Sequence, residues 1–243
     1  MTRLLTCVLC LISLSALAQG PTFKLKSSDW LVTAGSAALA TGSTWLRLKS
    51  QGYDPLDMPE FNRLEINKFD RNATKNWSLK SALQSDILAL SAQVLPTLIF
   101  LKQKGRNEYL TIGHIYAQST LLTLSATDFT KTLVRRNRPY MYGDKAPMRD
   151  RIAPSARFSF FSGHTSLTAS QCFLTAKIFS EMYPDSPNKS LVWSGAIICP
   201  AVVGYLRIRA GKHFPSDVIV GYLVGGLIGY LTPHFHLKRK NNE

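Results

Sequence analysis

The amino-acid sequence predicts an all-α protein, a helical bundle with five or six transmembrane helices and an active site at one end. The first observation is a series of apolar segments of 14 to 18 residues in the second two thirds of the chain. The second is that none of these segments alternates strictly between apolar and polar residues, as a half-buried strand does. Their length also exceeds the ~5–6 residues of an ordinary strand. With 243 residues, 45% of them hydrophobic, the chain has the size of one domain or one small membrane bundle.

The N-terminal residues have the pattern of a secretory signal peptide, which we predict over residues 1–18. Arg3 is followed by an apolar run over 4–14 and then by the small residues Ala16 and Ala18, which favour cleavage before Gln19. The alternative is an uncleaved first membrane helix, although the run is shorter than the ~20 residues that span a bilayer.

Residues 19–80 are predicted to form an N-terminal segment that is partly interfacial. Its stretch 30–46 is rich in Ala, Gly, Ser and Thr, and would supply the sixth crossing if it spans the membrane. Its stretch 51–81 is polar and contains Pro55 and Pro59, which favours a connecting or interfacial segment.

A helical domain is predicted over residues 81–236, followed by a basic tail over 237–243. Its five apolar segments are 87–101, 109–126, 165–182, 191–206 and 218–231. Polar residues within them and a mean hydropathy of −0.01 keep a soluble bundle as the alternative. The last two segments carry no internal charge, and Gly221, Gly225, Gly226 and Gly229 suit close helix packing in lipid. We therefore favour a membrane protein.

Charge predicts acidic partners and an orientation. Lys and Arg exceed Asp and Glu by 29 − 15 = +14, which favours phosphate groups or anionic lipid. No recognisable nucleic-acid module is present, so nucleic acid is not an expected partner. Basic residues lie between the first two apolar segments and after the last one, at Lys102, Lys104, Arg106, Lys238, Arg239 and Lys240. The positive-inside rule places this side in the cytoplasm and loops 130–162 and 207–217 on the opposite side.

Those opposite loops hold three groups of residues suited to phosphoryl transfer. They are Lys131 and Arg138 after the second segment, Ser162, Gly163 and His164 before the third, and Arg207, His213 and Asp217 between the fourth and fifth. In an up-and-down bundle all three groups lie at the same end. A transferring phosphoryl group carries negative charge on its equatorial oxygens, which Lys and Arg side chains can hold.

Two histidines, one carboxylate and the start of a helix can supply the other groups that phosphoryl transfer needs. His213 can attack phosphorus while Asp217, four residues later, orients its other ring nitrogen. His164 can protonate the leaving oxygen, and Ser162 and Gly163 can present backbone N–H groups to an anion. This chemistry requires no metal or cofactor. Taken singly, Ser162 could be only a helix N-cap, and Asp217 only an acidic residue in a first helical turn.

These residues resemble the signature of the type 2 phosphatidic acid phosphatase superfamily. Lys131, six residues, Arg138 and Pro139 match its first part completely. In the second part Phe161 replaces a proline before Ser162, Gly163 and His164, and in the third Leu206 replaces a serine before Arg207, His213 and Asp217. Neither replacement falls on a residue expected to do chemistry.

The resemblance implies a metal-independent phosphatase that hydrolyses phosphomonoester or diphosphate groups of a membrane lipid through a phosphohistidine at His213. Asp217 would orient His213, His164 would act as general acid, and Lys131, Arg138, Arg207, Ser162 and Gly163 would bind the phosphoryl oxygens. The site would face the periplasm or cell exterior from the cell membrane, with a lipid phosphate as substrate. The run 69–71 also looks like that of lipid A phosphatase-like members. The alternatives are a soluble periplasmic acid phosphatase of broad specificity, a vanadate-dependent haloperoxidase and a non-enzymatic protein that binds anionic lipid.

Overall fold

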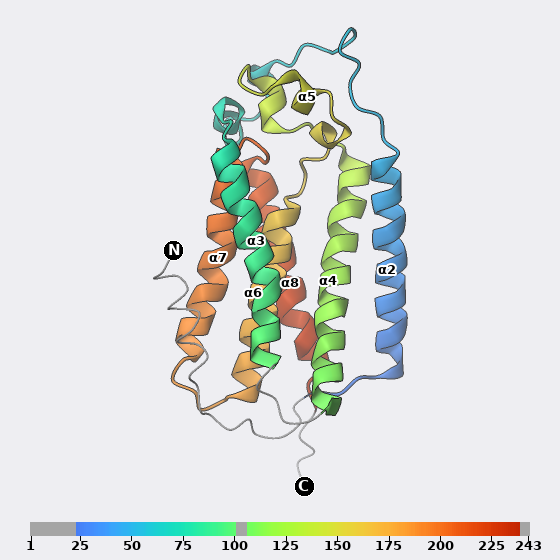
Figure 1. The fold of residues 1–243 in the computed structure, drawn as a ribbon, viewed down its shortest axis with the longest axis vertical. Helices are drawn as coiled ribbons and strands as arrows, with labels where there is room; N and C mark the ends of the chain where they lie inside the picture. The colour runs from blue at the N-terminus through green and yellow to red at the C-terminus, as the bar shows by residue number, and fades with distance from the viewer. Residues whose placement is uncertain (1–22, 101–105, 239–243) are drawn as a thin grey trace.

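The structure, a computed structural model, describes residues 23–100 and 106–238 and is a bundle of long helices (Figure 1). The long helices are α2 (Ser27–Leu48), α3 (Leu79–Phe100), α4 (Arg106–Val134), α6 (Gly163–Met182), α7 (Lys189–Arg209) and α8 (Pro215–Phe235). In the described residues, β-structure is limited to an isolated antiparallel bridge between Phe23 and Leu237. The all-α prediction is confirmed.

The helices follow the predicted apolar segments closely. Segments 109–126, 165–182, 191–206 and 218–231 lie inside α4, α6, α7 and α8, and 87–100 lies inside α3. The stretch 30–46, for which the sequence did not decide between spanning and not spanning the membrane, is helical and lies within α2. The predicted signal peptide and most of the basic residues used for the orientation lie outside the described residues.

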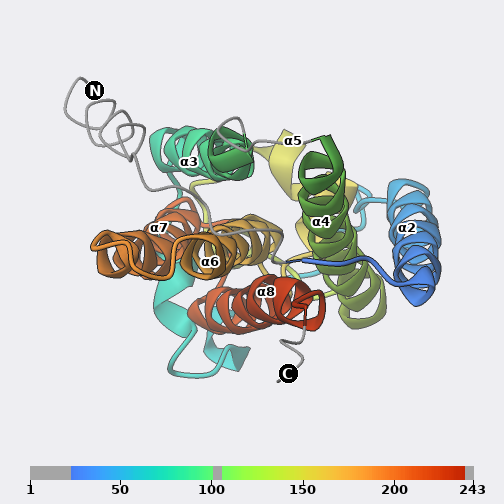
Figure 2. The same cartoon turned by 90° about the horizontal axis from the view of Figure 1, so that it is seen from below.

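Helix α6 is the centre of the bundle (Figure 2). It packs against α8, α7, α3 and α4, while α2 packs on the outer side of α4. Most residues of α6 are buried, and many of them have small or hydroxyl-bearing side chains. Ser119 and Thr123 of α4 form buried hydrogen bonds with Ser170 of α6. The central position of α6 places its N-terminus among the ends of the surrounding helices.

A glycine stripe allows α8 to approach α6 closely. A Cβ atom built on Gly225 would lie 2.0 Å from the carbonyl oxygen of Ser166. Gly221 and Gly229, one helical turn away on each side, would meet the carbonyl oxygens of Ser162 and Ser170 at 2.7 and 2.1 Å. The absence of side chains at these positions therefore brings two helix backbones into contact, as the sequence predicts.

Two of the described helices, α7 and α8, are long and apolar enough to cross a membrane. A helix of 21 residues is about 32 Å long at ~1.5 Å per residue, close to the ~30 Å hydrocarbon thickness. Leu191, Ile198, Leu223 and Leu227 are among the exposed apolar side chains on these helices. These features support membrane association.

Loops and short helices cover one end of the bundle (Figure 1). The polar segment after α2 contains the 3₁₀ helices η2 (Arg63–Glu65) and η3 (Arg71–Lys75). The segment between α4 and α6 contains η4 (Pro139–Tyr142), α5 (Met148–Arg151) and η5 (Pro154–Arg157). Both segments share an aromatic-rich cluster around Tyr140 and Met141. Within the predicted connecting or interfacial segment over 51–81, α3 begins at Leu79.

Candidate functional site

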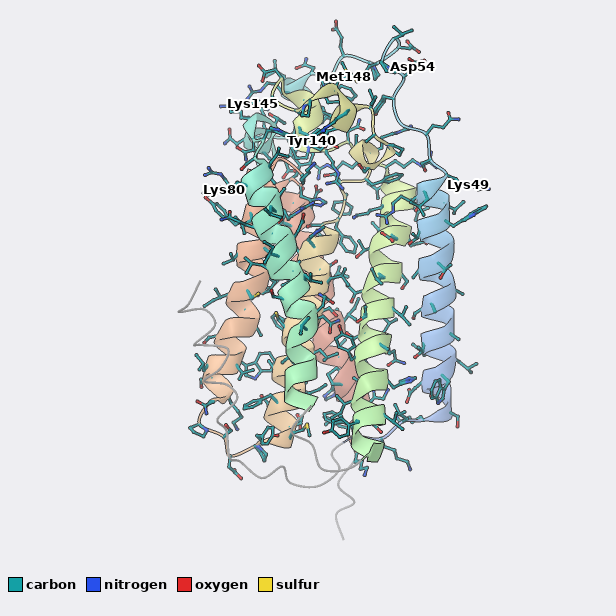
Figure 3. The ribbon with its side chains drawn as sticks, in the orientation of Figure 1. Lys49, Asp54, Lys80, Tyr140, Lys145 and Met148 are labelled. Atoms are coloured by element: carbon teal, nitrogen blue, oxygen red, sulfur yellow. The ribbon has the colours of Figure 1, made fainter. Side chains whose placement is uncertain are left out.

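Four helix ends meet below these loops and carry the predicted residues. Lys131 lies in the last turn of α4, and Arg207 lies in the last turn of α7. His164 is the second residue of α6, and Asp217 lies in the first turn of α8. Arg138 caps η4 and His213 lies in the α7–α8 loop. The structure thus brings all three sequence groups to one end of the bundle, the end that carries Tyr140 in Figure 3.

His213 is buried among cationic groups. Its side chain is 1% exposed, and its Nδ1 atom lies 3.6 Å from Oδ2 of Asp217 without a hydrogen bond. Burial, and then the charges of Arg138, Arg207 and Lys131, lower the pKa of His213 well below 6.5. The imidazole is therefore neutral at pH 7, and one ring nitrogen keeps a free lone pair.

Asp217 is fixed by three donors. Its carboxylate accepts hydrogen bonds from Ser159 Oγ at 2.5 Å, Arg136 Nη1 at 2.6 Å and the Phe214 backbone N–H at 2.9 Å. The last of these is the capping-box bond of α8, and Asp217 is an acidic residue in the first turn of that helix, as the alternative interpretation of Asp217 expected. The same carboxylate faces the Nδ1 atom of His213, so capping does not compete with an orienting role.

Arg136 and Asp70 are supporting residues that the sequence analysis missed. Arg136 binds Asp217 through Nη1 and Asp70 through Nη2, the latter at 2.7 Å. Asp70 also accepts hydrogen bonds from Ser216 N at 3.0 Å and Ser216 Oγ at 2.6 Å. Burial raises the pKa of Asp70, but hydrogen bonds from Arg136, Ser216 and Asn67 outweigh burial and lower it below 3.8. Two sequence signals were present: Arg136 lies between Lys131 and Arg138, and Asp70 lies in the run 69–71 that resembles lipid A phosphatase-like members, although no role was predicted for either residue.

Lys131 and Gly163 lie together at the N-terminus of α6. A Cβ atom on Gly163 would lie 3.3 Å from Nζ of Lys131, whose residue is 6% exposed. The first backbone N–H groups of a helix have no partners within it and attract anions. Ser162 is the N-cap, and its hydroxyl accepts a hydrogen bond from Thr165 N at 3.4 Å. The N-cap interpretation of Ser162 is therefore confirmed, and Gly163 leaves room for the lysine ammonium.

Arg207 and His164 share a carboxylate that the sequence did not reveal. Asp86, in α3, places Oδ1 3.0 Å from Arg207 Nη1 and 2.9 Å from His164 Nε2. The Asp86 side chain is 52% exposed, whereas that of Arg207 is 6% exposed. In the described structure Nε of Arg207 is buried without a hydrogen-bond partner. Arg207 thus retains an unused donor.

Arg138 is held by the covering loops. Its Nε donates to the Ser155 carbonyl oxygen at 2.8 Å and its Nη1 to that of Lys212 at 3.3 Å. Burial lowers the pKa of Arg138 from 12.5. Across the described part of the chain, no three His, Cys, Asp or Glu residues are grouped to hold a metal ion. The site is therefore a cluster of cationic groups around the neutral His213.

Cationic side chains gathered at one end of an apolar helical bundle are typical of a protein that binds an anionic group at that end. The PAP2 superfamily profile matches residues 113–241, and the chain belongs to this superfamily. The family resemblance of the sequence motifs is confirmed.

Three relatives illustrate the range of the superfamily. The chain is 25% identical over 141 residues to the lipid A 4'-phosphatase of Porphyromonas gingivalis, covering 57% of this chain and 56% of the relative. It is 32% identical over 111 residues to phosphatidylglycerophosphatase B of Bacillus subtilis, covering 45% and 51%. It is 32% identical over 136 residues to phospholipid phosphatase 2 of Rattus norvegicus, covering 44% and 46%. The chain therefore spans about half the length of these curated relatives.

A solved structure also aligns with the chain. The crystal structure of a transmembrane PAP2-type phosphatidylglycerolphosphate phosphatase from Bacillus subtilis covers 100% of this chain and 96% of its own, with a TM-score of 0.45 and 20% identity.

Proposed function

We propose that this protein is a phosphatase that hydrolyses a phosphate group of a membrane lipid through a phosphohistidine intermediate. The observation that carries the proposal is the buried, neutral His213 beside Arg138, Arg207 and Lys131 at one end of an apolar bundle. The names of the relatives, all phosphatases acting on lipids or phospholipids, support the same class of substrate.

Binding uses the cations and the α6 N-terminus. Lys131, Arg138 and Arg207 hold the phosphoryl oxygens, together with backbone N–H groups at Ser162 and Gly163. Because these groups are already in place before the substrate arrives, they stabilise charge that develops in the transition state without first reorganising.

The first chemical step forms the phosphohistidine. The free ring nitrogen of His213 attacks phosphorus, and the bond from phosphorus to the lipid oxygen breaks. His164 takes up a proton when the anionic substrate binds beside it and gives this proton to that oxygen, so the lipid leaves as an alcohol or a lower phosphate. Asp217 stabilises the positive charge that forms on the His213 ring.

The second step regenerates the enzyme. His164, now neutral, takes a proton from a water molecule whose oxygen attacks phosphorus. The bond between phosphorus and the His213 nitrogen breaks, and inorganic phosphate is released. Each group returns to its starting protonation state, so the cycle consumes only water.

We infer that the site faces the non-cytoplasmic side. Arg106 begins α4 and Lys238 follows α8, both at the end of the bundle opposite the site (Figure 1). The positive-inside rule supports a cytoplasmic position for that end.

The test is phosphate release by detergent-solubilised protein from phosphatidic acid, phosphatidylglycerol phosphate, undecaprenyl diphosphate, lipid A and p-nitrophenyl phosphate. We expect release from at least one lipid to exceed release from p-nitrophenyl phosphate. Equal release from the soluble ester would favour an acid phosphatase of broad specificity instead.

The variant for this test is His213→Ala, with His234→Ala as its control. His234 is an exposed histidine near the far end of α8. We expect His213→Ala to abolish phosphate release and to prevent the trapping of acid-labile ³²P on the protein, and His234→Ala to change neither. Normal turnover by His213→Ala would refute the nucleophile assignment.

A further inference from the structure

A second basic cavity lies beside the candidate site. It has a volume of about 320 Å³, and its lining includes Lys49, Arg135, Arg157, Leu46 and Phe158. No carboxylate lines it, and across residues 23–100 and 106–238 none of its three cations forms a salt bridge. Three unpaired cations around one cavity create a positive potential that favours an anion.

The cavity is joined to the candidate site through the backbone. Arg138 N donates to the Ala156 carbonyl oxygen at 2.8 Å, and Ser159 N donates to that of Arg136 at 2.8 Å. Residues 156–159 therefore run between the two places, with Arg157 and Phe158 lining the cavity while Ser159 holds Asp217. This short stretch of backbone thus links the lining of the cavity to the carboxylate that faces His213.

Exposed apolar side chains lie next in sequence to residues that line the cavity. Leu46 and Leu48 at the end of α2 are 50% and 76% exposed, and Leu133 and Val134 at the end of α4 are 67% and 47% exposed. Trp45, beside Lys49, is 53% exposed and carries the Lys49 ammonium 4.1 Å from its ring centroid. Tryptophan and lysine beside an apolar surface are typical of the level where lipid headgroups lie.

We propose that this cavity binds a second phosphate group of the same lipid substrate, while the first is held at His213. The proposal rests on the proposed phosphatase function and names its preferred substrates as lipids that carry two separate phosphate groups. The three cations at His213 are occupied by the reacting phosphate, so Lys49, Arg135 and Arg157 are additional to catalysis and select among substrates.

Arg135 offers a variant that removes a cation without harming the fold. Its φ angle is +47°, a left-handed conformation that glycine adopts more readily than arginine. It directly follows α4, where glycine is the usual residue in this conformation. Arg135→Gly should therefore be at least as stable as wild type, so a loss of activity would not reflect unfolding.

The experiment compares phosphatidic acid, with one phosphate, and phosphatidylglycerol phosphate, with two, at equal chain length in neutral detergent. Arg135→Gly and Lys49→Gln are tested beside Lys80→Gln, an exposed lysine on the other side of the same end (Figure 3). We expect each cavity variant to lower kcat/KM for the two-phosphate lipid about fivefold, mainly through KM, because a partly exposed ion pair contributes modestly to binding. Phosphatidic acid turnover and the Lys80→Gln variant should change less than twofold.

Other outcomes are decisive as well. Equal losses on both lipids, or no loss on either, would overturn the second-phosphate proposal. If the variants lose phosphatidic acid activity only when phosphatidylglycerol is added to the micelles, the cavity binds a neighbouring anionic lipid, which also overturns it. No phosphate release by wild type from any lipid of the panel used to test the proposed function would refute that function itself, and the cavity proposal with it.

Discussion

Replacing Arg136 with methionine tests whether the covering loops hold the candidate site together. Arg136 joins Asp70 in the first loop segment to Asp217 at the start of α8, and its guanidinium lies 4.0 Å from the Phe214 ring centroid. Methionine keeps much of the apolar contact with Phe214 but removes both ion pairs. Asp70 and Asp217, 1% and 0% exposed, would then be buried carboxylates without their cation.

The magnitude follows from this burial. Removing one partner of a buried ion pair costs ~3–5 kcal/mol. Because the Arg136 side chain is 24% exposed and water screens part of the interaction, we take the lower end, about 3 kcal/mol. For a chain of this size, 1 kcal/mol corresponds to ~2–4 °C, so the midpoint of thermal unfolding in mild detergent should fall by about 6–12 °C.

The pH dependence of this loss carries a definite sign. The folded-state pKa of Asp70 is lowered, so its contribution to stability is present above its ordinary pKa of 3.8 and is lost as the pH falls through the folded value. In Arg136→Met the main lowering influence is gone, so the Asp70 pKa rises and its carboxyl is protonated more readily. The difference between wild type and variant should therefore be largest at pH 7 and smaller at pH 4.

Unfolding midpoints at the two pH values provide the assay, with Arg149→Met as control. Arg149 is 81% exposed and lies 3.6 Å from Asp150, so its loss should shift the midpoint by less than about 2 °C. An Arg136→Met midpoint within 2 °C of wild type at pH 7, or a deficit that does not shrink at pH 4, would refute the reasoning.

Two further variants test the helix packing and the shared carboxylate. Gly225→Ala places a methyl group 2.0 Å from the Ser166 carbonyl oxygen, so we expect a loss of about 3 kcal/mol in thermal unfolding. Gly226→Ala, which meets only ordinary contacts at 3.7 Å, should be near neutral, and equal effects of the two would contradict the close approach of α6 and α8. Asp86→Asn removes the negative charge beside the His164 ring, so steady-state kinetics should show kcat about tenfold lower with KM little changed. An unchanged kcat would remove Asp86 from the proposed reaction.

The helices and the site residues could be predicted from the sequence because each depends on residues that lie close together in the chain. Apolar runs of 14 to 18 residues located α6, α7 and α8 to within a few residues at each end, whereas α3 begins eight residues before its run and α4 ends eight residues after its run. The spacing of chemically distinctive residues at the ends of those runs then placed all the predicted site residues at one end. Up-and-down connectivity alone is enough to bring them together.

The supporting residues could not be predicted in the same way, because their partners are distant in sequence and are residue types that occur many times in the chain. Arg136 meets Asp70 across 66 positions, and Arg207 meets Asp86 across 121. Asp70 is one of several acidic residues in a polar segment, and neither composition nor periodicity distinguishes it. Only the folding of that segment over the helix ends selects Asp70 as the partner of Arg136 and Ser216.

The partners of the cations at the site explain how a cluster of buried and half-buried cations is compatible with a stable fold. Lys131, Arg138 and Arg207 repel one another, and burying them is costly unless each has compensating partners. The structure partly provides these partners, since carbonyl oxygens hold Arg138 and Asp86 holds Arg207. Asp86 stays beside both Arg207 and His164, while Nε of Arg207 has no hydrogen-bond partner among the described residues. A bound phosphate dianion would accept from this donor and offset the remaining positive charge, which links the proposed activity to the same cations that the surrounding residues hold in place.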